Sequence, residues 1–433
     1  MSISSLNHLL EKKRFDEALN VAESLLSLDS SQGLVWKAMG TIFQNLGRPT
    51  EALGAMEYAA ELLPDDKSSQ LSRIQALFRN DQYGRARLYC EHMTQRWSEL
   101  PEPYEILGLI EELNQQPDRA ESYFNKALTL DETRLSSRVG VARLAVIQGH
   151  LPEAELHYRK AFRLLLNYKH SSLTDIYVES AVDELLMPST EQARIEGQES
   201  VLWKVLAQLS DQGIHGFATG STLSGLLRNE KALLSVHHLS IAMPYQMLAR
   251  ATNLLMQDGW LKEQLPVTLI NPRILRNPAN GTVLWLYGLR INPEAGQVLG
   301  GVWIKGLPDH WQQITRFPFP VSVHQEESVA GTVWVLDDPE SWLNAIFGDW
   351  NKPDAGFDTL VCARNQKGFA LLTRCLAYQR VIAFRNEGNL ERALAIAIRM
   401  RQAMPDDQLI REMVLFLYEE SERAAMQGLV SPY

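Results

Sequence analysis

The chain has 433 residues, and its 52 acidic and 42 basic side chains give a formal net charge of −10 at pH 7. This balance argues against a nucleic-acid partner or an anionic membrane surface, because both bind a positively charged face. Three cysteines are too few for a disulfide framework, no apolar run reaches the roughly 20 residues of a membrane span, and the N-terminus lacks a signal-peptide pattern. We therefore expect a soluble, cytoplasmic protein of two or three domains, with no membrane insertion.

The first 168 residues repeat with a period of 34. Alanine recurs at this interval, at Ala18, Ala52, Ala86, Ala120 and Ala154. The positions four residues later carry mostly larger side chains: Ala22, Met56, Cys90, Phe124 and Tyr158. A helix-turn-helix unit explains both sets, because small residues let two helices approach closely while larger ones fill the gap to the next unit. Residues 1–168 are therefore predicted to form five such units.

These units resemble tetratricopeptide repeats. The second unit fits that pattern best, with Trp36, Met39, Gly40, Phe43, Ala52, Met56, Ala59 and Pro64. The resemblance implies a helical solenoid whose concave groove binds a protein partner. The alternative is that the helices are only a scaffold for the rest of the chain. The expected groove positions carry Lys37, Thr41, Gln75, Glu105 and Arg143. They do not form the Lys and Asn clamp that some repeat families use, so no chaperone-tail ligand is expected.

The repeat period is lost after residue 168. Residues 169–198 are interpreted as a linker that includes a capping helix at 174–187. Residues 199–366 carry eight of the ten tryptophans, which are expected to lie mostly in a core. Segments 281–291, 297–305 and 330–336 are rich in β-branched and aromatic residues, whereas 199–211 and 245–258 have helical spacing. The region is predicted to be a mixed α/β domain with its own core.

Two motifs in this domain point to a family. The first contains Gly220, Ser221, Thr222, Leu223, Gly225 and Arg228, and the second runs from His238 to Pro244. Together with residues 342–353 they resemble, in order and spacing, the LicD/fukutin-type nucleotidyltransferase fold. The resemblance implies a mixed sheet and a Gly-Ser turn whose N–H groups approach a phosphate. It also implies strand carboxylates that hold Mg²⁺ for the transfer of a phosphorus-containing group.

The sequence departs from that family at the metal ligands. Alignment on residues 241–244 puts His238 and Ser240 at two ligand positions, and segment 301–308 puts Lys305 at the third. A lysine cannot ligate Mg²⁺, and its charge repels the ion. No metal site and no cofactor are therefore predicted. The domain is expected to have lost catalysis, or to bind a small anion through the turn together with Arg228 and Lys305.

The helical repeat pattern returns near the C-terminus. The same offsets reappear at Val381, Phe384, Gly388, Ala393, Ala397, Met400 and Pro405. Residues 367–426 are therefore predicted to form three further helices of the tetratricopeptide type. The expected fold is an all-α repeat solenoid, a central α/β domain with a mixed sheet resembling the nucleotidyltransferase fold, and a C-terminal helical repeat.

Three functions are considered, of which the first is the one we expect. The first is a non-catalytic interaction scaffold, in which the repeats bind a protein and the degenerate central domain is a second binding surface. The second is an active transferase of a phosphorylated alcohol or sugar in surface glycan synthesis, which needs Mg²⁺ and carboxylates from elsewhere, such as Asp309 or Asp349. The third is a repeat protein with an unrelated α/β domain inserted between its repeats.

Overall fold

The computed structural model describes residues 2–167, 197–228, 238–352 and 357–426. The chain divides into two compact units. The N-terminal unit comprises residues 1–141, and the C-terminal unit contains α10 and the described residues that follow it. The capping helix predicted at 174–187 lies outside the described residues. Of the predicted linker at 169–198, only residues 197 and 198 are described, and they lead into the next helix.

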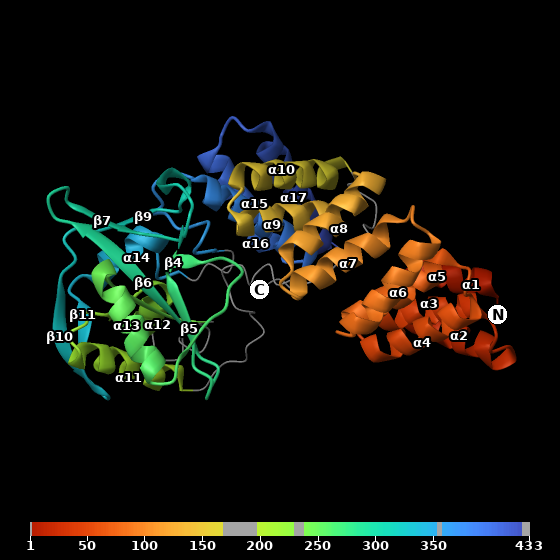
Figure 1. The fold of residues 1–433 in the computed structure, drawn as a ribbon, viewed down its shortest axis with the longest axis horizontal. Helices are drawn as coiled ribbons and strands as arrows, with labels where there is room; N and C mark the ends of the chain where they lie inside the picture. Colours follow the sequence, from red (N-terminus) through yellow and green to blue (C-terminus); the bar gives the residue numbers. More distant parts are fainter. Residues whose placement is uncertain (1, 168–196, 229–237, 353–356, 427–433) are drawn as a thin grey trace. The chain divides into compact units, whose positions relative to one another are not determined.

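The N-terminal unit consists of helices that follow one another in pairs, drawn in red to orange in Figure 1. Their bounds are α1 (Ile3–Glu11), α2 (Phe15–Leu28), α3 (Gly33–Asn45), α4 (Pro49–Leu62), α5 (Lys67–Arg79), α6 (Tyr83–Arg96), α7 (Pro101–Leu113) and α8 (Pro117–Leu130). α9 (Leu135–Gln148) and α10 (Leu151–Asn167) form the fifth pair in sequence. The helical part of the prediction for residues 1–168 is therefore correct.

The recurring alanines lie where the period predicts. All five are at most 1% exposed. The larger residues fill the spaces between helices, and Phe124 of α8 is completely buried. A Cβ atom added at Gly108 of α7 or at Gly140 of α9 would lie 2.6 Å from the ring of Phe124. Glycine at both positions thus allows the helices to close around this ring.

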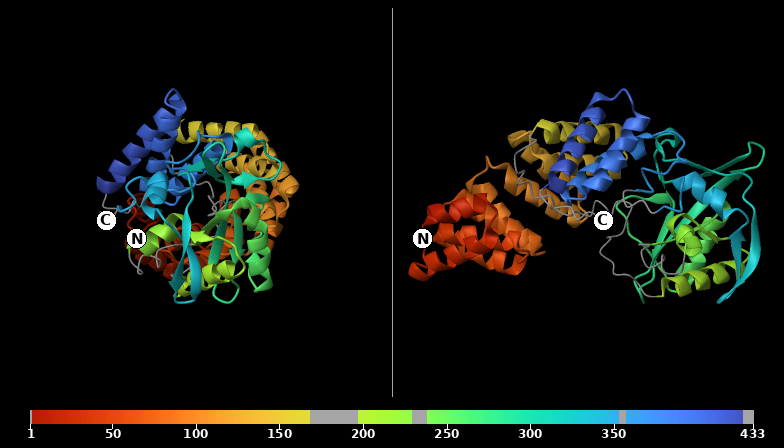
Figure 2. Two further views of the ribbon diagram at one scale, coloured as in Figure 1. Left: turned by 90° about the vertical axis from the view of Figure 1, so that its left-hand side faces the viewer. Right: turned by 180° about the vertical axis from the view of Figure 1, so that it is seen from behind.

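The C-terminal helices pack directly against α10. They are α15 (Leu371–Asn386), α16 (Leu390–Ala403) and α17 (Gln408–Met426), and both α15 and α17 contact α10 (Figures 1 and 2). The Tyr158 hydroxyl of α10 donates a hydrogen bond of 3.0 Å to the side chain of Gln379, which is 221 positions later in the chain. Arg159 forms an ion pair with Asp407. The central α/β region is thus inserted between helices that pack against one another.

The inserted region is built on a mixed sheet. Its strand order is β1 (Phe217–Ala218), β2 (Leu239–Pro244), β6 (Val283–Asn292), β5 (Arg273–Arg276) and β3 (Leu261–Lys262). β2 and β6 are parallel, and the other neighbours in this order are antiparallel. β7 (Gln297–Gly300) extends the sheet from β6, and β9 (Thr315–Phe317) pairs with β7.

Two antiparallel strand pairs and five helical segments complete the region among the described residues. The pairs are β4 (Leu269–Asn271) with β8 (Trp303–Ile304), and β10 (Val323–Ser328) with β11 (Gly331–Leu336). The helical segments are α11 (Gln198–Asp211), α12 (Gly220–Arg228), α13 (Tyr245–Gln257), α14 (Pro339–Phe347) and the short 3-10 helix η3 (Asp309–Trp311). The expected strands and helices of this domain are therefore present as a mixed α/β arrangement.

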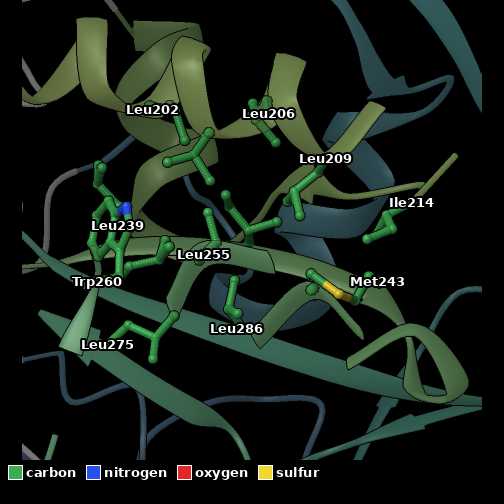
Figure 3. Packing of buried hydrophobic residues seen from close by; sticks show 14 of the residues in the cluster. Leu202, Leu206, Leu209, Ile214, Leu239, Met243, Leu255, Trp260, Leu275 and Leu286 are labelled. Atoms are coloured by element: carbon green, nitrogen blue, oxygen red, sulfur yellow. The ribbon is translucent and has the colours of Figure 1, made fainter. Parts of the chain in front are cut away.

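One hydrophobic cluster holds the helices against the sheet. In Figure 3, Leu202, Leu206 and Leu209 of α11 point toward residues of β2 and α13. Leu286 of β6 and Trp260 belong to the same buried cluster. The cluster fixes one face of β2, so that alternate residues of this strand face the other way. None of the described helices is long and apolar enough to cross a bilayer.

Candidate functional site

The Gly-Ser motif forms a turn between a strand and a helix. β1 ends at Ala218, Gly220 has a φ of +55°, and α12 begins at Gly220. Three hydrogen bonds fix the turn. The Thr219 N–H donates to the Ser240 carbonyl (3.0 Å), and the Ser240 N–H donates to the Thr222 hydroxyl (2.8 Å). The indole N–H of Trp342 donates to the Thr219 hydroxyl (2.8 Å). The turn is therefore held between β2 and α14.

A cavity opens beside this turn. It encloses about 700 Å³ of empty space, part of which is open to solvent. Gly220, Ser221, His238 and Ser240 all line it, so the structure brings together four of the residues that the sequence motifs single out. Thr222 lies behind them, buried, and its hydroxyl binds β2 as described above. β6, the neighbour of β2 in the sheet, adds Tyr287 and Leu289 to the lining.

The cavity lining is almost uncharged. No aspartate, glutamate, lysine or arginine is among the described residues that line it. His238 stacks on Trp285, with ring centroids 4.7 Å apart. Burial raises the pKa of the Tyr287 hydroxyl above its usual range, so this group stays neutral. The Ser240 residue is only 3% exposed, and its hydroxyl forms no hydrogen bond with a described residue. The lining suits an uncharged group that forms hydrogen bonds.

Two of the predicted anion-binding residues lie elsewhere. Lys305 is exposed beyond β8, and neither it nor Arg228 lines the cavity. The strand next to β2 is β6, whereas segment 301–308 contributes β8 to a separate two-stranded sheet. The prediction that Lys305 stands at a third ligand position beside Ser240 is therefore wrong. Arg228 is exposed at the end of α12, with its guanidinium 6.0 Å from the ring centroid of Trp350.

The carboxylates that an active transferase would need are not at the cavity. Asp309 is exposed at the start of η3, and Asp349 is exposed and paired with Lys352 at 2.9 Å. Neither residue lines the cavity. Within the part of the chain that the structure describes, no group of three His, Cys, Asp or Glu side chains is placed to hold a metal ion. The described residues therefore do not fit the divalent cation that this chemistry requires.

Other residues that line the cavity are not part of the sequence motifs. Gln313, Thr315 and Asn365 line it, and all three come from segments distant from the Gly-Ser turn. The side-chain amide of Gln313 donates to the carbonyl of Leu360, which ties the two segments of this part of the lining together. The only sequence signal for this part is the glycine pair at 300–301, since glycine in a strand pattern marks a close approach of backbone or ligand.

The predicted groove residues of the repeats divide into two groups. Lys37 and Thr41 on α3 and Gln75 on α5 are partly exposed. Lys37 donates to the Ser68 hydroxyl at 2.5 Å. Glu105 is completely buried, where it accepts hydrogen bonds from Arg134 (2.8 Å) and from the N–H (3.1 Å) and hydroxyl (2.8 Å) of Ser137.

Glu105 is therefore a link between neighbouring repeats rather than a groove surface residue. Arg143, at 3% exposure, is also buried. The prediction that these two residues are available to a partner is wrong.

The comparison with protein families agrees with the period of the helices. The family model described as tetratricopeptide repeat matches residues 37–101, which include α4, α5 and α6. The array carries tetratricopeptide repeats. No curated protein sequence matches the chain.

Several solved structures are similar to part of this chain. MamA from Desulfovibrio magneticus RS-1 is 19% identical with a TM-score of 0.34, and the match covers 38% of this chain and 93% of MamA. PilF from Pseudomonas aeruginosa is 19% identical with a TM-score of 0.33, over 38% of this chain and 80% of PilF. YrrB, whose structure is described as a TPR protein with an unusual peptide-binding site, is 17% identical with a TM-score of 0.32, over 38% of this chain and 86% of YrrB.

Proposed function

We propose that this chain is a non-catalytic interaction scaffold, in which the tetratricopeptide repeats bind a protein partner. The repeat array carries the proposal. Its recurring alanines are buried where neighbouring helices pack together. Repeat arrays of this kind present an extended face to peptides and proteins. Lys37, Thr41 and Gln75, which are partly exposed on the first helices of two repeats, supply polar contacts for the partner.

The central domain is a second binding surface in this proposal. Its order of strand, Gly-Ser turn, helix and strand supports a relationship to the LicD/fukutin-type nucleotidyltransferase fold. His238 and Ser240, which the resemblance aligns with metal-binding carboxylates, line the cavity, and β6 contributes Tyr287 to the same lining. A domain of this kind retains the cavity without the charge that seats Mg²⁺. It is therefore suited to bind a ligand rather than to transfer a phosphorus-containing group.

The groove is tested by photo-crosslinking from position 75 of the full chain in its native extract. A double variant, Thr41→Arg with Gln75→Arg, places two large cations on α3 and α5. The matched control is His92→Arg, which adds the same group to an exposed position of α6. The proposal expects one dominant crosslinked protein. In a separate affinity capture, the wild-type chain and the control should retain that protein, and the double variant should lose it. Equal capture by all three proteins would refute groove binding.

The non-catalytic part is tested by calorimetric titration with MgCl₂ and MnCl₂, with and without a nucleotide. No saturable metal binding is expected, because the described lining holds no carboxylate. A one-site metal signal would support the alternative, an active transferase of a phosphorylated alcohol or sugar. In that case Asp309→Asn and Asp349→Asn identify the acids: loss of the signal in either variant assigns that residue as a ligand.

A further inference from the structure

A second pocket lies next to the cavity and differs from it in charge. It is formed by β9, the end of α14 and residues 364–367, and it encloses about 830 Å³ that is largely open to solvent. Phe317 and Asn365 line both spaces. The pocket also contains Arg316, Arg364 and Lys367, which are all exposed, and its described lining includes no carboxylate.

Backbone pairing places two of these cations on one face. The Arg316 N–H donates to the Asn365 carbonyl at 2.7 Å, the Lys367 N–H donates to the Ile314 carbonyl at 2.8 Å, and residues 315 and 366 form an antiparallel bridge. Directly opposed residues of antiparallel segments share a face, and side chains alternate along each segment. Arg316, Asn365 and Lys367 are therefore directed to the same side.

The third cation depends on a glycine. The Arg364 N–H donates to the Ile346 carbonyl at 2.9 Å, which anchors the residue at the end of α14. Its guanidinium lies against Gly348, where a Cβ atom would be 2.4 Å from Cζ and where φ is +78°. The C-terminal end of a helix carries about half a negative charge, which offsets only a fraction of the three positive charges at the pocket.

These three charges have no protein counter-charge. Arg316, Arg364 and Lys367 lie within 4 Å of no carboxylate among the described residues. Other basic residues of the same unit are paired, as Arg276 is with Glu263 and Arg385 with Glu420. Like charges gathered in one pocket repel one another, although the chain as a whole is acidic. An anion in the pocket would remove this repulsion.

A neutral hydrogen-bonding group in the same wall also lacks a partner. Both side-chain atoms of Asn365, Nδ2 and Oδ1, are buried without a hydrogen bond to a described residue, and so is Oε1 of Gln366. Buried polar atoms are nearly always paired in folded proteins, and an unpaired one at a pocket is a position for a ligand or a bound water. The Asn365 amide therefore offers a directional donor beside the three cations.

We propose that this pocket binds an oxyanion, specifically a phosphate group. Arg316 and Arg364 are suited to donate to its oxygens through their planar guanidinium groups, Lys367 adds a point charge, and Asn365 Nδ2 adds a neutral donor. The site differs from the predicted one at Arg228 and Lys305, which the structure places outside both the pocket and the cavity. It does not depend on partner binding by the repeats.

The test is calorimetric titration of the full chain with inorganic phosphate at constant ionic strength set with NaCl. We expect saturable binding at one site. Arg364→Met removes one charged donor and should weaken binding about 10- to 100-fold, since a hydrogen bond to a charged group contributes about 1.5–3 kcal/mol. Lys305→Gln is the matched control, because it removes an exposed cation of the same unit that does not line the pocket, and it should change the affinity less than twofold.

Two further variants separate specific binding from general charge. Asn365→Leu keeps every charge and removes the amide, so it should weaken binding several-fold. Arg316→Met should act as Arg364→Met does. Both arginines are exposed and unpaired among described residues, so their loss should leave the thermal midpoint of the chain nearly unchanged. Phenyl phosphate in place of inorganic phosphate distinguishes an organic phosphate from the free ion, because only the former gains by reaching the cavity.

The outcomes are decisive in either direction. Saturable phosphate binding that is lost in Arg364→Met and kept in Lys305→Gln supports the site, whichever of the two phosphates binds more tightly. The absence of saturable binding by the wild-type chain would overturn it. So would equal affinity in wild type and Arg364→Met, or a loss in Lys305→Gln as large as that in Arg364→Met.

Discussion

The ion pair between Asp358 and Arg380 connects the repeat helices to the cavity, and its removal gives a quantitative test of this connection. Both side chains are 7% exposed. Arg380 lies on α15, and Asp358 begins the segment whose residues 359–367 contribute to the walls of both pockets. Asp358 also accepts hydrogen bonds from the N–H groups of Leu360 (3.0 Å) and Val361 (2.9 Å). This carboxylate therefore organises the segment and anchors it to α15.

The variant Arg380→Met keeps most of the side-chain volume and leaves the Asp358 charge buried without its cation. Breaking a buried pair in this way costs about 3–5 kcal/mol. The two remaining N–H donors stabilise the carboxylate, so we expect a value near the lower end, about 3 kcal/mol. For a unit of this size that corresponds to a fall of roughly 6–12 °C in the unfolding midpoint. Lys352→Met breaks an exposed pair of the same unit and should cost less than about 1 kcal/mol.

Differential scanning calorimetry measures the midpoint, and limited trypsin digestion reports on the segment itself. Arg364 and Lys367 are exposed trypsin sites within it. In Arg380→Met we expect cleavage at both to accelerate relative to wild type and to Lys352→Met. If Arg380→Met neither lowers the midpoint by more than the control nor increases cleavage, the ion pair does not anchor the segment and the connection proposed here is wrong.

Three other predictions concern the stability of the fold. Gly108→Ala should destabilise the N-terminal unit by about 1–3 kcal/mol, because the added methyl group clashes with Phe124. The control Gly54→Ala, with no atom near its added Cβ, should be neutral or stabilising by up to about 1 kcal/mol. Urea denaturation followed by circular dichroism measures both variants, and equal effects would contradict the packing argument. Asp338→Ala removes the carboxylate that accepts from the Ser341 N–H at the start of α14 and should cost about 1 kcal/mol by the same measurement, with Glu340→Ala as a control that leaves this cap in place. Burial opposes the ionisation of Asp407, but the hydrogen bond and charge of Arg159, together with the N–H groups of Leu409 and Ile410, outweigh burial and lower the pKa of this carboxyl below its usual value. Its stabilisation is therefore present above about pH 4 and is lost as the pH falls through the folded pKa. The stability difference between wild type and Arg159→Met should therefore shrink between pH 6 and pH 3 in urea titrations, and a constant difference would show that Asp407 is not the group responsible.

The helical repeats are readable from the sequence because their signal is local and periodic. Ala52 and Ala86 occupy equivalent places in neighbouring repeats, and both are buried as the period requires. The sequence period does not predict which charged side chains are buried. Glu105 falls at a groove position by count, but Arg134 and Ser137 bind it within the protein. A charged residue in a repeat gives no indication in the sequence of whether a neighbouring repeat satisfies it.

The cavity was predictable only where its residues are close in the chain. Gly220 and Ser221, at the start of α12, meet Ser240 because β1, which ends just before them, pairs with β2. Lys305 was misplaced because strand composition does not indicate which strand will pair with β2, and β6 takes that place. Gln313 and Asn365 reach the cavity through long-range contacts, for which spacing along the chain contains no information.

The insertion of the central domain has a consequence for the order of events during synthesis. Gln379, which accepts a hydrogen bond from Tyr158 of α10, is synthesised 221 residues after Tyr158. At ordinary elongation rates of about 5–20 residues per second, the face of α10 that α15 covers waits roughly 10–40 seconds for its partner. The nascent array must tolerate this exposed apolar end, or a chaperone must shield it, until the last three helices close it.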